Sequence, residues 1–254
     1  KLVTGVQTCA LPISSRMKAI VLTYDRNAIL TEHMIRCYED LWPDHPFVFR
    51  IPFQNFERCI PANNREYVKS PPEIQATVLL LLAGCEDEEW VYWCIDDKYP
   101  IKLELNNIKL VHNSIFTDKT EGIAGILFCR ARKMLDPEYL TDATIIADGV
   151  QLLERKSYHQ IWIHQFVKVK VLRHLFLSFP KIVKAKMMDD LKFQVQKPVS
   201  HRLFVTSINY AIFGESSSDG QITLNCSKSM AEKGIEIPKW FEVNNKRTTI
   251  IGML

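Results

Sequence analysis

The sequence lacks the patterns that identify several classes of protein. None of its uncharged apolar runs is long enough to span a bilayer. The seven cysteines are odd in number, irregularly spaced and without a Cys-x-x-Cys pair, so neither a zinc site nor a disulfide framework is predicted. Internal repeats are absent. The formal net charge of +3 is too close to neutral to indicate a polyanionic partner.

What is present is an ordinary globular composition. Of 254 residues, 47% are hydrophobic and 24% are charged, which suits one α/β domain. Several cysteines lie inside apolar runs, as expected of reduced, buried thiols in a cytoplasmic protein. The start of the chain differs from the rest, because residues 1–14 resemble translated sequencing-adapter DNA. We expect 1–16 to be a non-native leader and 17–254 to be the domain.

The hydrophobic pattern predicts that the domain begins with a βαβ unit. The apolar run 19–22 is typical of a buried parallel strand, the polar residues 23–27 form a loop, and helical spacing follows until Pro43. A second strand is predicted at 47–51, a helix from Pro72 to Gly84, and the strongest strand at 90–95. Beyond these we expect a helix over much of 101–113, strands at 123–129 and 144–147, a helix over 166–179 and a strand over 203–213.

Two acidic residues, Asp96 and Asp97, stand at the carboxyl end of the strongest predicted strand. Ligands of open α/β sheets bind at the carboxyl ends of the strands. Adjacent carboxylates repel unless a cation compensates them, and Mg²⁺ or Mn²⁺ bridging a diphosphate would do so. Lys98 could add a charge-assisted contact to phosphate. A plain polar turn explains the pair about equally well, so the pair alone does not decide.

The residues around this pair resemble a motif of bacterial GT-A-type glycosyltransferases, of the kind that build capsules and lipopolysaccharides. The resemblance covers roughly Met17 to Pro100, and rests on Ile95-Asp96-Asp97-Lys98-Tyr99-Pro100 and Thr23-Tyr24-Asp25-Arg26. It implies a GT-A-like (Rossmann-like) α/β fold, with a mixed sheet flanked by helices in a single domain. It further implies transfer of a sugar from a nucleotide sugar to a glycan or lipid-linked acceptor.

The resemblance also assigns roles to individual positions. Asp97 would bind Mn²⁺ or Mg²⁺, and Asp96 would share the metal or touch the ribose or sugar. The remaining donor-binding positions would be Thr23, Tyr24, Asp25, Arg26 and Lys98. The adjacent acids depart from the common Asp-x-Asp form, which leaves open which carboxylate binds the metal and whether metal is required.

The catalytic residue is not identified by the sequence. An inverting enzyme needs a carboxylate or histidine near the acceptor hydroxyl, and the weak candidates are Asp148, Glu154, His159 and Glu215. Glu215 lies in a flexible polar loop, which an ordinary surface hairpin explains at least as well. Lone histidines such as His159 are more often structural than catalytic.

The second half contains a basic stretch, 166–202, whose only acidic residues are Asp189 and Asp190. Interleaved apolar residues would let it contact an anionic membrane, which suits a cytoplasmic enzyme held at the inner membrane face. The alternative is a solvated face whose lysines extend over the core. We also weighed a nucleotidyltransferase, which should have a glycine-rich loop at 23–27, and a non-catalytic module that binds through 166–202. We expect no nucleic-acid partner.

Overall fold

The computed structural model describes residues 16–55, 59–117, 120–130, 137–245 and 250–252. The leader that the sequence predicts at 1–16 therefore lies almost entirely outside the described residues. A nine-stranded mixed sheet has the order β3-β2-β1-β4-β9-β6-β10-β8-β7. Its strands are β1 (Met17–Leu22), β2 (Phe47–Phe53), β3 (Arg65–Lys69), β4 (Trp90–Ile95), β6 (Ile123–Leu127), β7 (Leu140–Ala147), β8 (Val150–Arg155), β9 (Gln165–Lys168) and β10 (Arg202–Thr206).

The direction of the strands changes across the sheet. β1 runs parallel to both β2 and β4, and β2 runs parallel to β3. β9 is antiparallel to both of its neighbours, β4 and β6, while β6 and β10 are parallel. The carboxyl ends of β1, β4, β6 and β10 therefore meet along one edge of the sheet, and this edge carries the predicted site.

The central strands β1 and β4 are buried on both faces of the sheet, which explains their continuous apolar sequences. Alternate residues of β1 and β4 enter two separate core clusters. Val21 and Tyr92 belong to one cluster, whereas Ile20 and Trp93 belong to the other. The sequence prediction of a mixed α/β sheet flanked by helices is confirmed in this arrangement.

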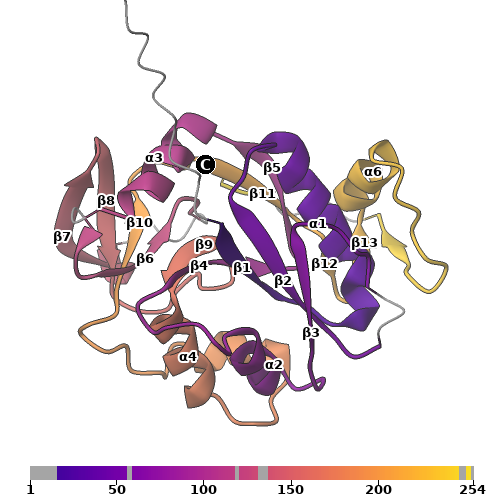
Figure 1. Cartoon of the computed structure of the whole chain (residues 1–254), viewed down its shortest axis with the longest axis horizontal. Coiled ribbons are helices and arrows are strands. Elements are labelled where there is room, and N and C mark those ends of the chain that lie inside the picture. Colours follow the sequence, from indigo (N-terminus) through magenta and orange to yellow (C-terminus); the bar gives the residue numbers. More distant parts are fainter. Residues whose placement is uncertain (1–15, 56–58, 118–119, 131–136, 246–249, 253–254) are drawn as a thin grey trace, which may run out of the picture.

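Helices cover each face, as Figure 1 shows. On the upper side in that view lie α1 (Ala28–Leu41), α3 (Leu105–Ser114) and α6 (Leu224–Glu232). Below the sheet lie α2 (Ile74–Leu81) and α4 (Val169–Ser178), and α5 (Ala185–Leu191) packs with them through Met188. Two short 3₁₀ turns, η1 (Asp25–Asn27) and η5 (Pro137–Tyr139), precede α1 and β7.

A second sheet begins directly after the acidic pair. Residues 96–97 connect β4 to β5 (Lys98–Leu103), which leaves the large sheet and pairs antiparallel with β11 (Ala211–Glu215). β15 (Ile250–Ile251) is the third strand of this sheet, in the order β15-β11-β5. A third, small sheet contains β12 (Ser217–Ser218), β13 (Gln221–Thr223) and β14 (Val243–Asn244).

Three element predictions are corrected. The helix predicted over 101–113 begins only at Leu105, because the chain up to Leu103 pairs with β11. The single strand predicted over 203–213 is two strands in different sheets, separated by residues 207–210. The segment 166–179 contains the last residues of a strand, up to Lys168, and is a helix from Val169 to Ser178, so most of its alternating residues lie in the helix.

The described cysteines are free, and most of them are buried. Within the described ranges, no helix combines the length and the apolar character that crossing a membrane requires.

Candidate functional site

A cleft lies at the carboxyl ends of β1 and β4. It consists of two adjoining cavities of about 410 Å³ and about 370 Å³. Both cavities are lined by residues from β1, the start of α2, the end of β4 and the start of α5, namely Leu22, Ile74, Ile95, Asp97 and Ala185. The first cavity adds Thr23, Tyr24, Asn27 and Asp96, and the second adds Lys98 and Trp162. The fold thus brings the 23–27 loop and the acidic pair into one cleft.

Asp96 is the buried member of the pair. Its side chain lines the cleft, but the residue is only 6% exposed, and its Oδ2 atom has no hydrogen-bond partner. Burial raises the pKa of Asp96 to about 7, and the negative charge of Asp97 adds to this, while hydrogen bonds from Thr23 and Asn27 act in the opposite direction. Near neutral pH this carboxyl is therefore poised between its neutral and charged forms.

Asp97 is the accessible member, with 43% of its side chain exposed. The Lys98 ammonium donates to Asp97 Oδ1 at 3.1 Å, and Lys98 itself is 8% exposed. The backbone carbonyl of Asp97 accepts a hydrogen bond from the Ser216 amide at 2.7 Å, which anchors the turn to the end of β11. One carboxylate and one buried ammonium therefore face the cleft from adjacent positions.

The 23–27 loop places its residues in different surroundings. Thr23 is buried and lines the cleft, and its hydroxyl accepts from Thr31 at 2.8 Å. Tyr24 is 47% exposed and also lines the cleft. The Asp25 carboxylate instead accepts from the Gln54 and Asn55 amides at 2.9 and 2.5 Å, so it ties the loop to the end of β2.

Arg26 points to another part of the protein. Its guanidinium carbon lies 5.4 Å from the centre of the Phe241 ring, a cation–π contact with the segment after α6. Arg26 is not among the residues that line the cleft. Of the four donor-binding positions predicted in this loop, the structure brings Thr23 and Tyr24 to the cleft, and gives Asp25 and Arg26 other contacts.

The four candidate catalytic residues are scattered. Asp148 lies in the β7–β8 turn, four strand positions away from β4, or roughly 19 Å at the usual strand spacing. Glu154 on β8 accepts two hydrogen bonds from Arg202 at 3.0 and 2.9 Å, which lower its pKa. His159 stacks on Tyr139 with ring centres 4.2 Å apart, and burial lowers its pKa. None of these three lines the cleft.

Glu215 has a different position. It ends β11 and is the register partner of Lys98, so its backbone lies beside the acidic turn. Glu215 is not among the residues that line the cleft either, but the fold places its backbone beside Lys98.

The buried histidine His164 supports the end of β4 directly before the acidic pair. Its Nε2 atom lies 3.0 Å from the Ile95 amide nitrogen and 2.9 Å from the Ile95 carbonyl oxygen, directly before Asp96. Its Nδ1 atom lies 2.6 Å from the Tyr38 hydroxyl, which in turn lies 2.8 Å from the Tyr92 hydroxyl. This buried chain fixes the end of β4. No sequence spacing links these residues, so only the pairing of β4 with β9 reveals it.

The carboxylates are compatible with a divalent cation that also has non-protein ligands. Asp97 presents an exposed side chain to the cleft, and Asp96, whose buried Oδ2 has no hydrogen-bond partner, lines one of the same two cavities. The described residues contain no group of three or more His, Cys, Asp or Glu side chains arranged to hold a metal. Mg²⁺ commonly takes one or two carboxylates together with phosphate oxygens and water, and such a set is what these residues could complete.

The basic stretch 166–202 is partly neutralised by acids that the sequence reading did not connect to it. Glu88, in the turn before β4, accepts from Lys168 and Lys170 at 2.7 and 2.5 Å, and Asp87 pairs with Arg173. Arg202 pairs with Glu154 and Lys192 pairs with Asp189. The first part of the stretch is therefore not a free cationic surface, which weakens the case for a nucleic-acid binding module.

Comparisons with known proteins found only distant structural similarity to this chain. No protein-family model and no curated protein matches this chain. Among solved structures, the chain is similar to the galactosyltransferase LgtC in complex with donor and acceptor sugar analogues. The identity is 11%, the TM-score is 0.41, and the match covers 85% of this chain and 78% of that one.

A second similar structure is that of an active-site mutant of LgtC, with 12% identity and a TM-score of 0.37. That match covers 71% of this chain and 66% of the other, so this chain spans just under two thirds of its length. At such distances the case for a function rests on the geometry of the cleft.

Proposed function

We propose that this chain is a GT-A-like glycosyltransferase that moves a sugar from a nucleoside-diphosphate sugar to a glycan or lipid-linked acceptor. The observation that carries the proposal is the convergence of three features in one cleft. These are the exposed Asp97 carboxylate, the buried Lys98 ammonium and the loop residues Thr23 and Tyr24. All of them lie at the carboxyl ends of β1 and β4, where α/β sheets bind their ligands.

The chemistry follows from the charges. Sugar transfer leaves a nucleoside diphosphate, so negative charge builds on the leaving oxygens. Lys98, already held beside the cleft by Asp97, would donate to those oxygens. A Mn²⁺ or Mg²⁺ ion, held by Asp97 and Asp96, would supply further neutralisation of that charge. Tyr24 would lie against the nucleoside, because its exposed ring borders the same cavity as Thr23.

Among the candidate bases, we favour Glu215 for activating the acceptor hydroxyl. It is the carboxylate whose strand runs beside Lys98.

The first test is thermal melting with UDP, GDP, CDP and TDP, each with and without Mn²⁺. A ligand that binds only the folded state stabilises it by about 2.7 kcal/mol at a hundredfold excess over its dissociation constant. We expect one diphosphate to raise the melting temperature, Mn²⁺ to enlarge the rise, and Asp97→Ala to remove it. The shift caused by ligand is the readout, since Asp97→Ala also leaves Lys98 without its partner and changes the starting stability.

Asp142→Ala is the matched control, because Asp142 is exposed on β7, far from the cleft. It should keep the full ligand-induced shift. If no diphosphate stabilises the wild-type protein under any condition, or if both variants respond equally, the proposed donor site is wrong.

A further inference from the structure

The connection between α4 and α5 exposes large apolar side chains to solvent. Ile182 is 87% exposed, Leu177 in the last turn of α4 is 59% exposed, and Met187 on α5 is 54% exposed. Farther along the chain, Phe193 is 51% and Val199 is 92% exposed. Single exposed apolar residues are common, but several within one short stretch indicate an interaction surface.

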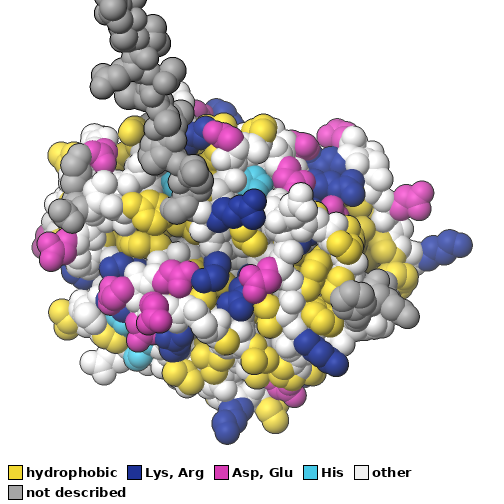
Figure 2. Space-filling model, viewed as in Figure 1, with side chains coloured by type: hydrophobic (Ala, Val, Ile, Leu, Met, Phe, Trp, Pro, Cys, Tyr) yellow, Lys and Arg dark blue, Asp and Glu magenta, His cyan; other side chains and the backbone are white. Residues whose placement is uncertain are grey.

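These residues belong to segments that are held together. The His174 Nε2 atom on α4 lies 3.0 Å from the Gln196 carbonyl oxygen, which holds the segment after α5 against α4. The Gln75 side-chain amide on α2 donates to the Phe176 and Phe179 carbonyls at 2.9 and 2.7 Å, which fixes the end of α4. We call this surface the 177–199 face. Figure 2 shows hydrophobic and basic side chains next to each other along the lower edge of the molecule, where Figure 1 places α2 and α4.

Lysines flank the exposed apolar residues Ile182 and Met187 in the chain. Lys181, Lys184 and Lys186 are exposed, and no carboxylate of the described ranges forms an ion pair with them. They differ in this from Lys168 and Lys170, which Glu88 neutralises.

The opposing acids on this face are few. Asp189 already pairs with Lys192, so Asp190 is the acidic residue of α5 that remains to offset the three lysines. The 177–199 face therefore keeps a positive charge beside its apolar residues.

We propose that the 177–199 face docks on an anionic lipid surface. Ile182, Leu177 and Met187 would enter the boundary between headgroups and acyl chains, and the lysines would contact the anionic headgroups. Protruding apolar side chains ringed by lysines are the combination that binds such surfaces. An uncharged protein surface would leave the three lysines without opposite charges, which is why we favour an anionic lipid surface.

The docked face borders the cleft. Ala185 and Met188 on α5 line the cavities that also contain Asp97. A lipid surface under α5 would therefore lie next to the opening of the cleft and would deliver a lipid-linked acceptor to it. This consequence for the acceptor rests on the proposed function, whereas the docking itself does not.

Sedimentation with lipid vesicles tests the docking without any assay of sugar transfer. Vesicles of phosphatidylcholine alone would be compared with an equimolar mixture of phosphatidylcholine and phosphatidylglycerol, at low and high salt. We expect the full chain to sediment with the anionic vesicles, to bind the neutral ones far more weakly, and to be released by salt. Equal binding to both kinds of vesicle, or to neither, would overturn the proposal.

Variants then locate the contact. Reversing the charge of two lysines, Lys181→Glu with Lys184→Glu, should weaken binding roughly 30-fold or more, as expected from about 1 kcal/mol per lysine near an anionic surface. The matched pair Lys69→Glu with Lys239→Glu changes two exposed lysines elsewhere. Its affinity for the anionic vesicles should stay much closer to that of the wild type. A larger loss from the control pair than from the test pair would contradict the assignment of this face.

The apolar contribution needs its own pair of variants. Ile182→Ser should reduce binding, and Ile146→Ser, at a residue that is 72% exposed on β7, should leave it unchanged.

Analytical ultracentrifugation without lipid tests whether the face instead joins two copies of the chain. If the wild type is a dimer that Ile182→Ser dissociates, the face is an interface between two copies and the lipid proposal is wrong. Nucleotide-induced melting shifts in Ile182→Ser would show separately whether the cleft remains intact.

Discussion

At the scale of single residues, burial decides the protonation state of groups near the cleft. Burial lowers the pKa of His164 to about 3, and the positive charge of Lys98 contributes in the same direction. The ring is thus neutral in the folded protein, where it lies between Tyr38 and the backbone of Ile95. Burial likewise lowers the pKa of His33 and of His201 to about 4. The folded protein resists protonation at each of these positions.

This resistance predicts a loss of stability in acid. An unfolded histidine takes up a proton near pH 6.5, whereas folded His164 does so only near 3. Below pH 6.5 the unfolded state therefore binds one more proton, and the free energy of unfolding falls by about 1.4 kcal/mol per pH unit. We expect His164→Gln to remove that part of the slope between pH 6.5 and 5, as measured by urea denaturation. Tyr38→Phe, which keeps the titrating ring, should retain the slope, and an unchanged slope in His164→Gln would contradict a neutral buried ring.

At the scale of elements, the pairing of β5 with β11 holds the acidic turn in place. Gly214 on β11 lies opposite Tyr99 on β5, and a Cβ atom at Gly214 would lie 2.7 Å from Cζ of that ring. The strand therefore needs glycine there for space. The end of β11 continues to Ser216, whose amide donates to the Asp97 carbonyl. A shift of β11 would thus be transmitted to the cleft.

We expect Gly214→Ala to destabilise the protein by about 1–3 kcal/mol, the usual cost of overpacking, and to reduce the nucleotide-induced melting shift. Gly125→Ala on β6 is the comparison. There the nearest atom to a new Cβ is Leu203 Cδ2 at 2.8 Å, the end of a flexible side chain that can move. Thermal denaturation should show a smaller loss for Gly125→Ala. Equal losses would mean that the ring of Tyr99 also yields easily.

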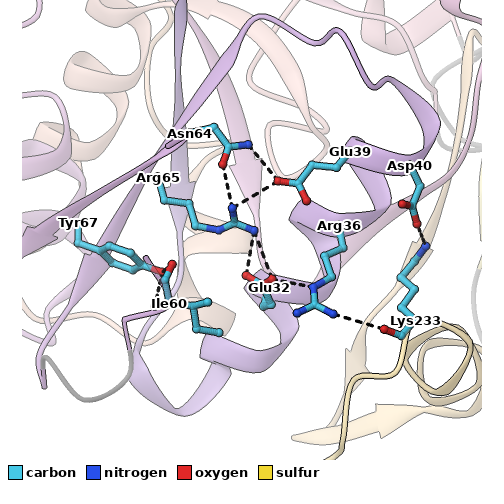
Figure 3. A network of polar contacts seen from close by, with 9 residues as sticks. All are labelled: Glu32, Arg36, Glu39, Asp40, Ile60, Asn64, Arg65, Tyr67 and Lys233. Atoms are coloured by element: carbon cyan, nitrogen blue, oxygen red, sulfur yellow. Dashed lines mark hydrogen bonds and ion pairs between the residues drawn. The ribbon is translucent and has the colours of Figure 1, made fainter. Parts of the chain in front are cut away.

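At the scale of the whole molecule, a polar network joins segments far apart in the chain. Figure 3 shows Arg65 on β3 reaching the carboxylate of Glu32 on α1, with nitrogen–oxygen distances of 3.2 and 3.1 Å. Arg36 also donates to Glu32, and its guanidinium reaches the carbonyl of Lys233 after α6. The Glu32 and Arg65 side chains are only 6% and 4% exposed, so water solvates neither charge; Arg65 also pairs with the more exposed Glu39 at 3.3 Å.

Breaking this pair should therefore cost much more than breaking an exposed one. We expect Glu32→Gln to destabilise the protein by about 3 kcal/mol, the lower end for a broken buried pair, because Arg65 keeps a buried charge whose remaining carboxylate partner is the more exposed Glu39. Glu66→Gln removes the partner of Arg50 at a glutamate that is 46% exposed, and should cost less than about 1 kcal/mol. Urea denaturation of both variants makes the comparison. The double variant Glu32→Met with Arg65→Met should recover much of the loss, and a similar loss from both single variants would argue against a desolvated pair.

The strands of the large sheet could be predicted where hydrophobic pattern and local turn signals agree. This holds for β1, β2, β4 and the helix between β1 and β2. β5 was missed because its partner β11 lies far along the chain, and no local pattern reports such a pairing. The segment 203–213 was read as one strand because its apolar residues run on, although the chain passes from one sheet to another at 207–210.

For the candidate site, the sequence identified the acidic pair and its place at a strand end, but not the state of each acid. Adjacent residues in a turn point in different directions, and the packing around β1 and β4 buries Asp96 while leaving Asp97 open. The sequence also did not reveal the surroundings of Asp25, whose carboxylate accepts hydrogen bonds from backbone amides at the end of β2. The family resemblance implied a nucleotide contact there, whereas the backbone amides of Gln54 and Asn55 give Asp25 a structural one.

The sequence by itself determined the alternation of strand and helix, the buried faces of β1 and β4, and the position of Asp96 and Asp97 after β4. These depend on hydrophobic periodicity and short-range turns, which act within a few residues. Only the tertiary structure decided that Lys98 pairs with Asp97, that Glu88 neutralises Lys168 and Lys170, and that Lys181 and Lys184 remain free of carboxylates in the described ranges. Charge pairing depends on distance in space, and the folding of the sheet sets that distance between residues that are far apart in the chain.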